Sequence, residues 1–226
     1  MIRSFGDKST ARVFSGDQPR GMARDLAIAA RRKLIVIDAA ERLDDLRVPP
    51  PGNRLEALRG DRVGQHSIRI NGQWRVVFVW REDGAHEVEI VDYHQRPTGT
   101  GRQDMATRQV ISREDLDEGR VDFTDMESSG CLPPVHPGDV LRHDFLDPLS
   151  LSAHALAMAL RVPPNRITAI LAGDRAVTAD TALRLARHFG TSPGFWLNLQ
   201  KAYDLEVTER AKGERIRAEV VPRVAA

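Results

Sequence analysis

An alternating stretch near the middle of the N-terminal half constrains this chain most. Ser67–Ile70 and Gln73–Trp80 alternate in polarity around Asn71-Gly72, a pair favoured in hairpin turns whose two central residues take positive φ. A second turn at Asp83-Gly84 leads into another alternating segment, His86–Tyr93. The pattern predicts three consecutive antiparallel strands.

Helical spacing precedes these strands. Between Ala23 and about Leu46, apolar residues recur with the period of an amphipathic helix. Prolines 49–51 end it, because proline lacks the backbone donor and restricts the residue before it. Ile2–Phe5 is apolar enough for an edge strand. We predict an α+β fold, a small curled antiparallel sheet with N-terminal helices.

The chain has 226 residues, which suits two domains better than one. We place them at residues 1–94 and 137–226, joined by an acidic, mostly flexible linker at 95–136 that lacks a sustained apolar period. Met105 begins a segment that resembles a natural N-terminus, as if two proteins were read through as one.

Composition favours a soluble, cytoplasmic protein. Lys and Arg total 33 against 32 Asp and Glu, so net charge points to no particular partner. Cys131 is the single cysteine, which excludes an intramolecular disulfide. The N-terminus lacks an apolar signal core, and no run approaches the roughly 18 apolar residues of a membrane helix.

The second domain is predicted to be all helical. Ser152 is placed to cap one helix, and the turn at Val162-Pro163 leads into another that begins at Pro164 and ends before Gly173. Two short helices joined by a tight turn make a helix-turn-helix. Further amphipathic helices surround Leu185 and follow Pro193.

The first domain resembles the HigB toxins of the RelE superfamily. The resemblance rests on the run LxxLRGDRxGxHSIRIxxQWRVVF and the closing DYH, and it covers essentially residues 1–94. It implies a small ribosome-dependent endoribonuclease that cuts mRNA without a metal or cofactor. No HxxxH motif, cysteine pair or acidic cluster with ligand spacing occurs in this domain, so we expect no metal site.

Metal-free RNA cleavage requires groups that move protons and cations that stabilise phosphate charge. Asp92, Tyr93 and His94 match the functional C-terminal triplet of the family, which implies proton transfer by His94. It also implies base stacking or proton assistance by Tyr93 and an orienting role for Asp92. The residues assigned to phosphate are the arginines of the same segment, Arg62, Arg69 and Arg75.

One position departs from the family. Some members carry a functional histidine where this chain has Glu56, and glutamate accepts a proton but supplies no positive charge. His66 is a candidate substitute that would join the phosphate-binding set, although a strand-surface histidine explains it equally well. The alternative to a catalytic site is that the DYH segment is an ordinary strand end and that the arginines form a solvated sheet face.

Residues 137–205 resemble the HigA antitoxins of the Xre-type helix-turn-helix class, through VPPNRITAILAGDRAVTADTALRLARHFGTSPGFWLNLQKAYDL. The resemblance implies a lambda-repressor-like domain that binds palindromic operators as a dimer, with its second helix in the major groove. Base contacts are assigned to Asn165, Arg166 and Thr168, and phosphate contacts to Ser152 and Arg175. Arg166 and Arg175 as plain solvent-facing charges remain the alternative.

These features together predict a fused toxin and antitoxin. The expected partners are operator DNA, the ribosome and mRNA once the toxin is released, and toxin–antitoxin contacts within or between chains of a homodimer. A tethered inhibitor acts at a high effective concentration, on the order of millimolar for a short flexible linker. The alternative is a DNA-binding regulator whose N-terminal domain is inert and serves in assembly.

Overall fold

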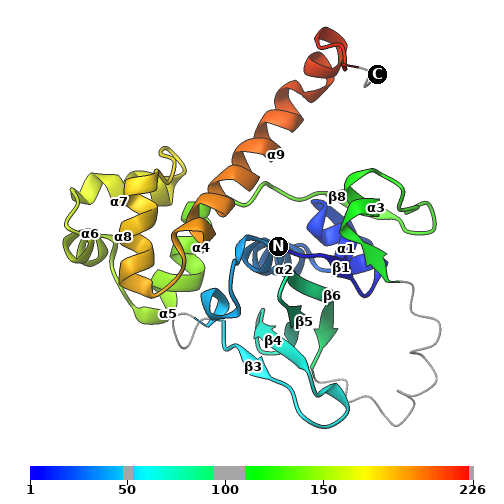
Figure 1. The fold of residues 1–226 in the computed structure, drawn as a ribbon, viewed down its shortest axis with the longest axis horizontal. Helices are drawn as coiled ribbons and strands as arrows, with labels where there is room; N and C mark the ends of the chain where they lie inside the picture. The colour runs from blue at the N-terminus through cyan, green and yellow to red at the C-terminus, as the bar shows by residue number, and fades with distance from the viewer. Residues whose placement is uncertain (48–52, 94–109, 224–226) are drawn as a thin grey trace.

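Two layers make up the N-terminal half of the protein, a six-stranded sheet and the long helix α2 (Figure 1). The computed structural model describes residues 1–47, 53–93 and 110–223. The elements of the half that carries the sheet are β1 (Ser4–Phe5), α1 (Lys8–Phe14), β2 (Asp17–Pro19), α2 (Arg24–Ala39), η1 (Leu43–Leu46), β3 (Glu56–Ala57), η2 (Gly60–Arg62), β4 (Gln65–Arg69), β5 (Trp74–Arg81) and β6 (Gly84–Asp92).

The sheet has the strand order β3-β4-β5-β6-β1-β7, and the prediction of an α+β fold is confirmed. Strands β3 to β6 are antiparallel neighbours, whereas β1 runs parallel to β6. Helix α2 contacts β5 and β6, and its apolar side chains meet the sheet residues Ile68, Val76 and Phe78 in one buried core. One face of the sheet is therefore covered by α2.

The turn between β4 and β5 differs from the predicted two-residue hairpin. Neither Asn71 nor Gly72 has a positive φ. The Asn71 side-chain oxygen instead accepts hydrogen bonds from the backbone nitrogens of Gln73 (2.9 Å) and Trp74 (2.8 Å), an Asx-type turn. The side chain of Asn71 thus closes a longer loop.

The described part of the connector, residues 110–136, is built into the fold. It contains β7 (Ile111–Ser112), α3 (Arg113–Asp117) and β8 (Ser128–Cys131). Strand β7 pairs with β1, and β8 pairs with β2 in a separate two-stranded sheet. The expectation of an edge strand at Ile2–Phe5 is therefore wrong, because β1 lies between β6 and β7.

The expectation of a mostly flexible linker also fails for these described connector residues. The physical reason lies in two apolar side chains, Ile111 and Leu132, which are 4% and 0% exposed. Each anchors one of the short strands by joining the buried core. Residues 94–109 lie outside the described part of the chain.

Helices make up the C-terminal half, as predicted. They are α4 (Pro137–Val140), the π-helical turn η4 (Leu141–Leu146), α5 (Asp147–Leu149), α6 (Ala153–Leu160), α7 (Pro164–Ala172), α8 (Ala179–Phe189) and α9 (Pro193–Glu219). Aromatic side chains fill its core, with Trp196 close to both Phe145 (4.9 Å between ring centroids) and Phe195 (5.2 Å).

Helix α9 joins the two halves. Its N-terminal part packs on α8, α4 and α2, and the remainder projects beyond the body of the molecule (Figure 1). At 27 residues it is about 40 Å long. None of the described helices is both long and apolar enough to cross a membrane.

Candidate functional site

Two arginines lie side by side on the face of the sheet away from α2. Arg69 of β4 is directly opposite Arg75 of β5. Directly opposite residues share a face, and successive residues of a strand alternate between faces. Val76 and Ile68 point into the core under α2, so Arg69 and Arg75 point away from it. The β4–β5 pairing therefore brings these two arginines together.

Tyr93 stands beside Arg75. The guanidinium carbon of Arg75 is 4.4 Å from the centre of the Tyr93 ring, a cation–π contact. The backbone nitrogen of Tyr93 donates to the carbonyl of Gln73 (2.8 Å), which fixes the chain just after β6. The Tyr93 side chain is 55% exposed, so one face of its ring is open to a ligand.

The Arg75 guanidinium also has one buried donor that no acceptor uses among the described residues. Its Nη1 atom is shielded from solvent and has no hydrogen-bond partner among the described residues. A buried donor without a partner costs about 1–3 kcal/mol. An anionic ligand oxygen is a suitable acceptor for such a donor.

The other residues assigned to this site lie on different elements around the two arginines. Glu56 is exposed on β3 opposite Ser67, and therefore shares the face of the arginines. Arg62 is half-buried in η2, within the loop between β3 and β4. Asp92 lies opposite Trp74 and accepts a hydrogen bond from the Gln73 side chain (2.6 Å). His94 lies outside the described residues.

His66 does not join the arginine face. It pairs with Phe78 across β4 and β5, and the two rings stack at 6.0 Å on the α2 side of the sheet. Burial, and secondly the charge of Arg47, lowers the pKa of His66 below its usual range. A neutral ring on the opposite face is poorly suited to holding the phosphate that Arg69 and Arg75 would hold.

The helix-turn-helix presents the second group of candidate residues. The Ser152 hydroxyl caps α6 by accepting from the backbone nitrogen of Ala155 (3.1 Å), and Arg161, with φ of 56°, ends that helix. Asn165 is exposed in the first turn of α7. Arg175 is exposed in the loop that follows α7.

Arg166 and Thr168 are already engaged. Arg166 Nη1 lies 2.5 Å from a carboxylate oxygen of Asp180 on α8. The Thr168 hydroxyl donates back to its own helix, most closely to the carbonyl of Asn165 (3.2 Å). Of the three residues assigned to base contacts, Asn165 is therefore the one whose side chain is best presented.

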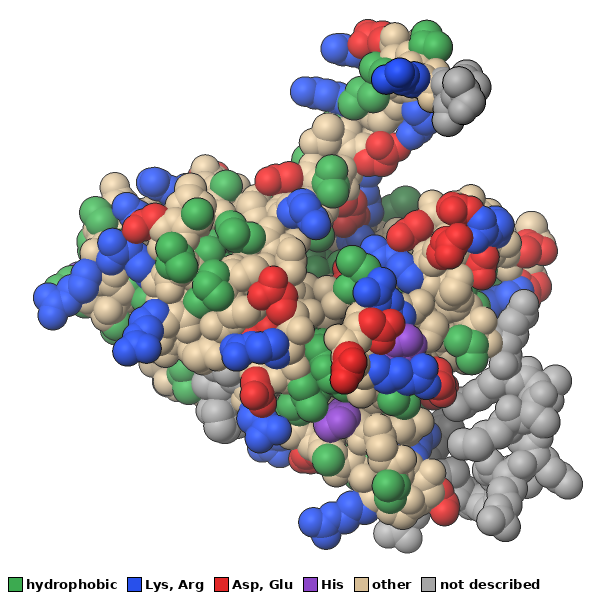
Figure 2. Space-filling view, in the orientation of Figure 1, with side chains coloured by type: hydrophobic (Ala, Val, Ile, Leu, Met, Phe, Trp, Pro, Cys, Tyr) green, Lys and Arg blue, Asp and Glu red, His purple; other side chains and the backbone are tan. Residues whose placement is uncertain are grey.

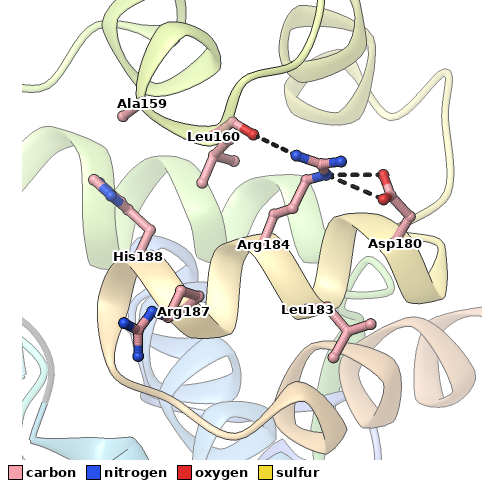
Figure 3. A pocket seen from close by; sticks show the side chains of 7 residues that line it. All are labelled: Ala159, Leu160, Asp180, Leu183, Arg184, Arg187 and His188. Atoms are coloured by element: carbon pink, nitrogen blue, oxygen red, sulfur yellow. Dashed lines mark hydrogen bonds and ion pairs between the residues drawn. The ribbon is translucent and has the colours of Figure 1, made fainter.

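A shallow hollow lies beside this region, between α6 and α8 (Figure 3). Arg184 bridges its rim, donating to the carbonyl of Leu160 (2.9 Å) and to Asp180 (3.0 Å). Arg187 and His188 lie along the same helix. Figure 2 shows basic side chains gathered over the end of the molecule formed by α6 and α7. This end can face a polyanion.

A third group of functional residues was not predicted from the sequence, the polar contacts that join the two halves. Asp45 is fully buried and accepts from the backbone nitrogen (2.7 Å) and hydroxyl (2.9 Å) of Ser192, the N-cap of α9. The Asn198 side chain donates to the carbonyl of Ala39 (3.1 Å). The N-cap of helix α9 is thus held by the Asp45 carboxylate, which belongs to the half that carries the sheet.

Basic residues of α2 complete this junction. Lys33 is ion-paired with Asp144, which is fully buried, and Arg32 donates to the same carboxylate (3.1 Å). Arg31 donates to Glu206 of α9 (2.7 Å). The signal for this interface was the triplet Arg31-Arg32-Lys33 between the apolar segments 26–30 and 34–37 of the same helix. Among the described residues, no group of three metal-ligating side chains is present.

Comparison with known families defines the class. Residues 3–94 match the model of the RelE-like toxin of the type II toxin–antitoxin system HigB, and residues 144–196 match a helix-turn-helix model. The chain therefore belongs to the HigB-like toxins through its first half and to the helix-turn-helix proteins through its second. It is a fusion of a toxin with an antitoxin-like region.

Individual relatives agree with this division. The chain is 38% identical over 96 residues to toxin HigB-1 of Vibrio cholerae, covering 42% of this chain and 99% of that protein. It is 40% identical over 72 residues to antitoxin HigA-1 of the same organism, covering 32% of this chain and 68% of that one. A solved Pseudomonas aeruginosa antitoxin HigA with the higBA promoter is 41% identical, with a TM-score of 0.40, covering 41% of this chain and all of that one.

Proposed function

We propose that the N-terminal half is a metal-independent, ribosome-dependent mRNA endoribonuclease. The observation that carries the proposal is the arginine face: Arg69 and Arg75 adjacent, with Tyr93 against Arg75. Two guanidinium groups hold the scissile phosphate and stabilise the charge that develops on it. The unpartnered Nη1 of Arg75 is a donor available to a phosphate oxygen.

The roles of the other candidate residues follow from their positions relative to the two arginines and from the chemistry of their side chains. Tyr93 stacks on a base, and His94, the next residue, transfers the proton in the cleavage step. Glu56 shares the arginine face and accepts or orients a proton there. Asp92 has an indirect, orienting role, since its carboxylate accepts a hydrogen bond from the Gln73 side chain. Arg62 binds the RNA backbone from the loop beside the sheet.

A matched pair of substitutions tests the nuclease assignment. Residues 1–132 form the appropriate toxin unit, because this segment retains β7 and β8. Arg75→Gln is expected to lower cleavage of ribosome-bound mRNA about 100-fold through the loss of charge stabilisation. Arg81→Gln, on the exposed end of the same strand, is expected to leave the rate unchanged. Equal rates for the two variants would show that the arginine face is only a solvated surface.

We also propose that the C-terminal half binds operator DNA as a homodimer and represses its own operon. Helix α7 enters the major groove, Asn165 contacts a base, and Ser152 and Arg175 contact phosphates. Arg166 and Thr168 contribute after exchanging their present partners for DNA. Footprinting of the intact chain on its upstream region is expected to protect a palindrome, and a mass measurement with DNA should give two chains per operator. Absence of protection would remove this half of the proposal.

Within the intact chain the nuclease is proposed to be neutralised without occlusion of the arginine face. The contacts that join the halves come from α2 and the segment up to Asp45, on the covered side of the sheet. The bulk of the C-terminal half on α2 would then obstruct entry to the ribosomal decoding site. If the chain were instead a regulator with an inert N-terminal domain, separating the halves would release no cleavage.

A further inference from the structure

The described part of the connector is bound to the toxin half near both of its ends. At its start, Ile111 lies opposite Phe5 and Ser112 opposite Ser4, which adds β7 antiparallel to β1. The backbone nitrogen of Arg113 then donates to the carbonyl of Arg3 (2.8 Å). This is strand addition to a sheet edge, a common mode of peptide recognition in which backbone hydrogen bonds provide the affinity.

The Arg113 side chain fixes this strand from the side. Its Nη1 atom is 2.8 Å from a carboxylate oxygen of Asp38, at the end of α2. Its guanidinium carbon is 4.6 Å from the centre of the Phe14 ring on α1. A guanidinium held by both a carboxylate and an aromatic face is a specific contact, which a lysine would reproduce poorly.

The far end of the connector is attached as firmly. Strand β8 pairs with β2, and the backbone nitrogen of the buried Leu132 donates to the carbonyl of Gly16 (2.8 Å). Arg12, itself 8% exposed, donates to the carbonyl of Met126 (2.6 Å). The backbone nitrogen of Arg20 donates to the carbonyl of Glu127 (2.9 Å). A second edge of the toxin half is thereby covered.

Charge complementarity supports this arrangement. Figure 2 shows acidic side chains gathered over the region of α3. Across the contact, Lys8 pairs with Asp125 (3.0 Å) and Arg20 pairs with Glu127. The connector is acidic where the adjoining toxin surface supplies basic partners.

Contacts with the C-terminal helices are found at the end of this segment. The carbonyl of Leu132 accepts from Arg210 of α9 (2.9 Å), and the His136 ring meets Tyr203 at 4.7 Å. Residues 111–132 are therefore continuous with the helical half in the chain and bound to the toxin half in space.

We infer that residues 111–132 are a toxin-binding arm, a second attachment that holds the helical half on the toxin independently of the covalent link through residues 94–109. The partner that fits the edges of β1 and β2 is this arm. A chain cut between residues 94 and 110 stays assembled. Release of the toxin requires two sets of contacts to break: those of the arm, and those of α2 and Asp45 with α9, here called the α2–α9 junction. The inference concerns association, so it stands whether or not the toxin half cleaves RNA.

The test uses the full chain with a site-specific protease sequence inserted after Thr100. After cutting, hydrogen exchange is measured at Arg113 and Leu132, whose amides bond to the toxin half, and at Ser192, whose amide reports the α2–α9 junction. All three are expected to stay protected as in the uncut chain. Loss of protection at Arg113 and Leu132, with Ser192 still protected, would overturn the inference.

The strength of the arm is read from the dissociation rate of the two pieces. Arg113→Ala removes the Asp38 and Phe14 contacts and is expected to speed dissociation at least about 10-fold. The matched control is Arg120→Ala, in the same arm, where Arg120 pairs with Asp115 of the arm itself. An unchanged far-UV circular dichroism spectrum of the uncut Arg113→Ala protein shows that its fold is intact.

A further variant and its control cover the case in which Arg113→Ala fails to fold. Val110, 51% exposed beside β7, is replaced by proline in one protein, and Ile111 is replaced by serine in another. Ile111→Ser is expected to accelerate dissociation, because it removes a buried anchor, and Val110→Pro is expected to leave it unchanged. Equal dissociation rates for Arg113→Ala or Ile111→Ser and their controls would show that the arm contributes nothing to holding the pieces together.

Discussion

Asp45→Asn probes the junction between the two halves most sharply. The Asp45 carboxylate is fully buried and accepts four hydrogen bonds besides a contact with the Arg42 side chain. The donors are the backbone nitrogens of Ser192 (2.7 Å), Glu41 (3.0 Å) and Arg42 (3.1 Å) and the hydroxyl of Ser192 (2.9 Å). Asparagine keeps the shape of the side chain but turns one acceptor into a donor.

The magnitude follows from the groups that lose a partner. If the amide oxygen occupies the Oδ2 position, the buried Ser192 N–H faces an NH2 group. In the reverse orientation, the backbone donors of Glu41 and Arg42 do so. Because each buried donor left unpaired costs about 1–3 kcal/mol and the carboxylate charge is also lost, we expect the free energy of unfolding to fall by about 2–4 kcal/mol.

Urea unfolding of the intact chain, followed by far-UV circular dichroism, measures this loss. The matched control is Asp44→Asn, one residue away, whose exposed carboxylate lies 3.3 Å from Arg47. An exposed pair of this kind contributes at most about 1 kcal/mol. Equal midpoints for the two variants would refute the account of Asp45 as the anchor of α9.

Three other substitutions test separate parts of the account. Gly194→Ala places a methyl group where the carboxylate of the exposed Glu41 now lies, and because the end of that side chain can turn away, protection of the Ser192 amide to exchange should be unchanged. His136→Gln should reduce the loss of unfolding free energy that occurs as pH falls below about 6.5, measured by unfolding at a series of pH values. Burial lowers the pKa of His136 despite Asp139 and Asp204, so its contribution is full above the unfolded pKa of about 6.5 and is lost as pH falls through the folded value. Asn165→Ala should weaken operator binding about 10-fold or more in a titration, against no change for the exposed Leu183→Ala.

Much of the fold was predictable because its pattern is local. The alternation around Asn71-Gly72 placed Arg69 opposite Arg75, and the cap and turn signals from Ser152 to Gly173 bounded α6 and α7 closely. Local pattern did not reveal the turn chemistry, in which the Asn71 side chain closes the loop. It also missed α1, a short helix capped by Asp7.

Long-range pairing accounts for the features that the sequence did not reveal. Strand β7 contains only two residues, too few for a periodic signal, and it exists because β1 offers it an edge. Local alternation places His66 on the opposite face from Arg69, since three residues along a strand reverse the direction of the side chain. Which of the two faces α2 covers is decided by long-range packing. The role of Asp45 depends on Ser192, 147 residues away.

Cleavage of ribosome-bound mRNA, mapped by primer extension, tests the central claim most directly. Four full-length proteins are compared: the intact chain, the double variant Asp45→Asn with Arg113→Ala, which disrupts both the junction and the arm, and each of these with His94→Ala. Cleavage is expected from the double variant alone, because loosening both the junction and the arm frees the nuclease and His94 carries its proton transfer. Cleavage by the intact chain at the same rate as by the double variant would contradict neutralisation. No cleavage by a double variant whose halves have been shown to separate would contradict the nuclease.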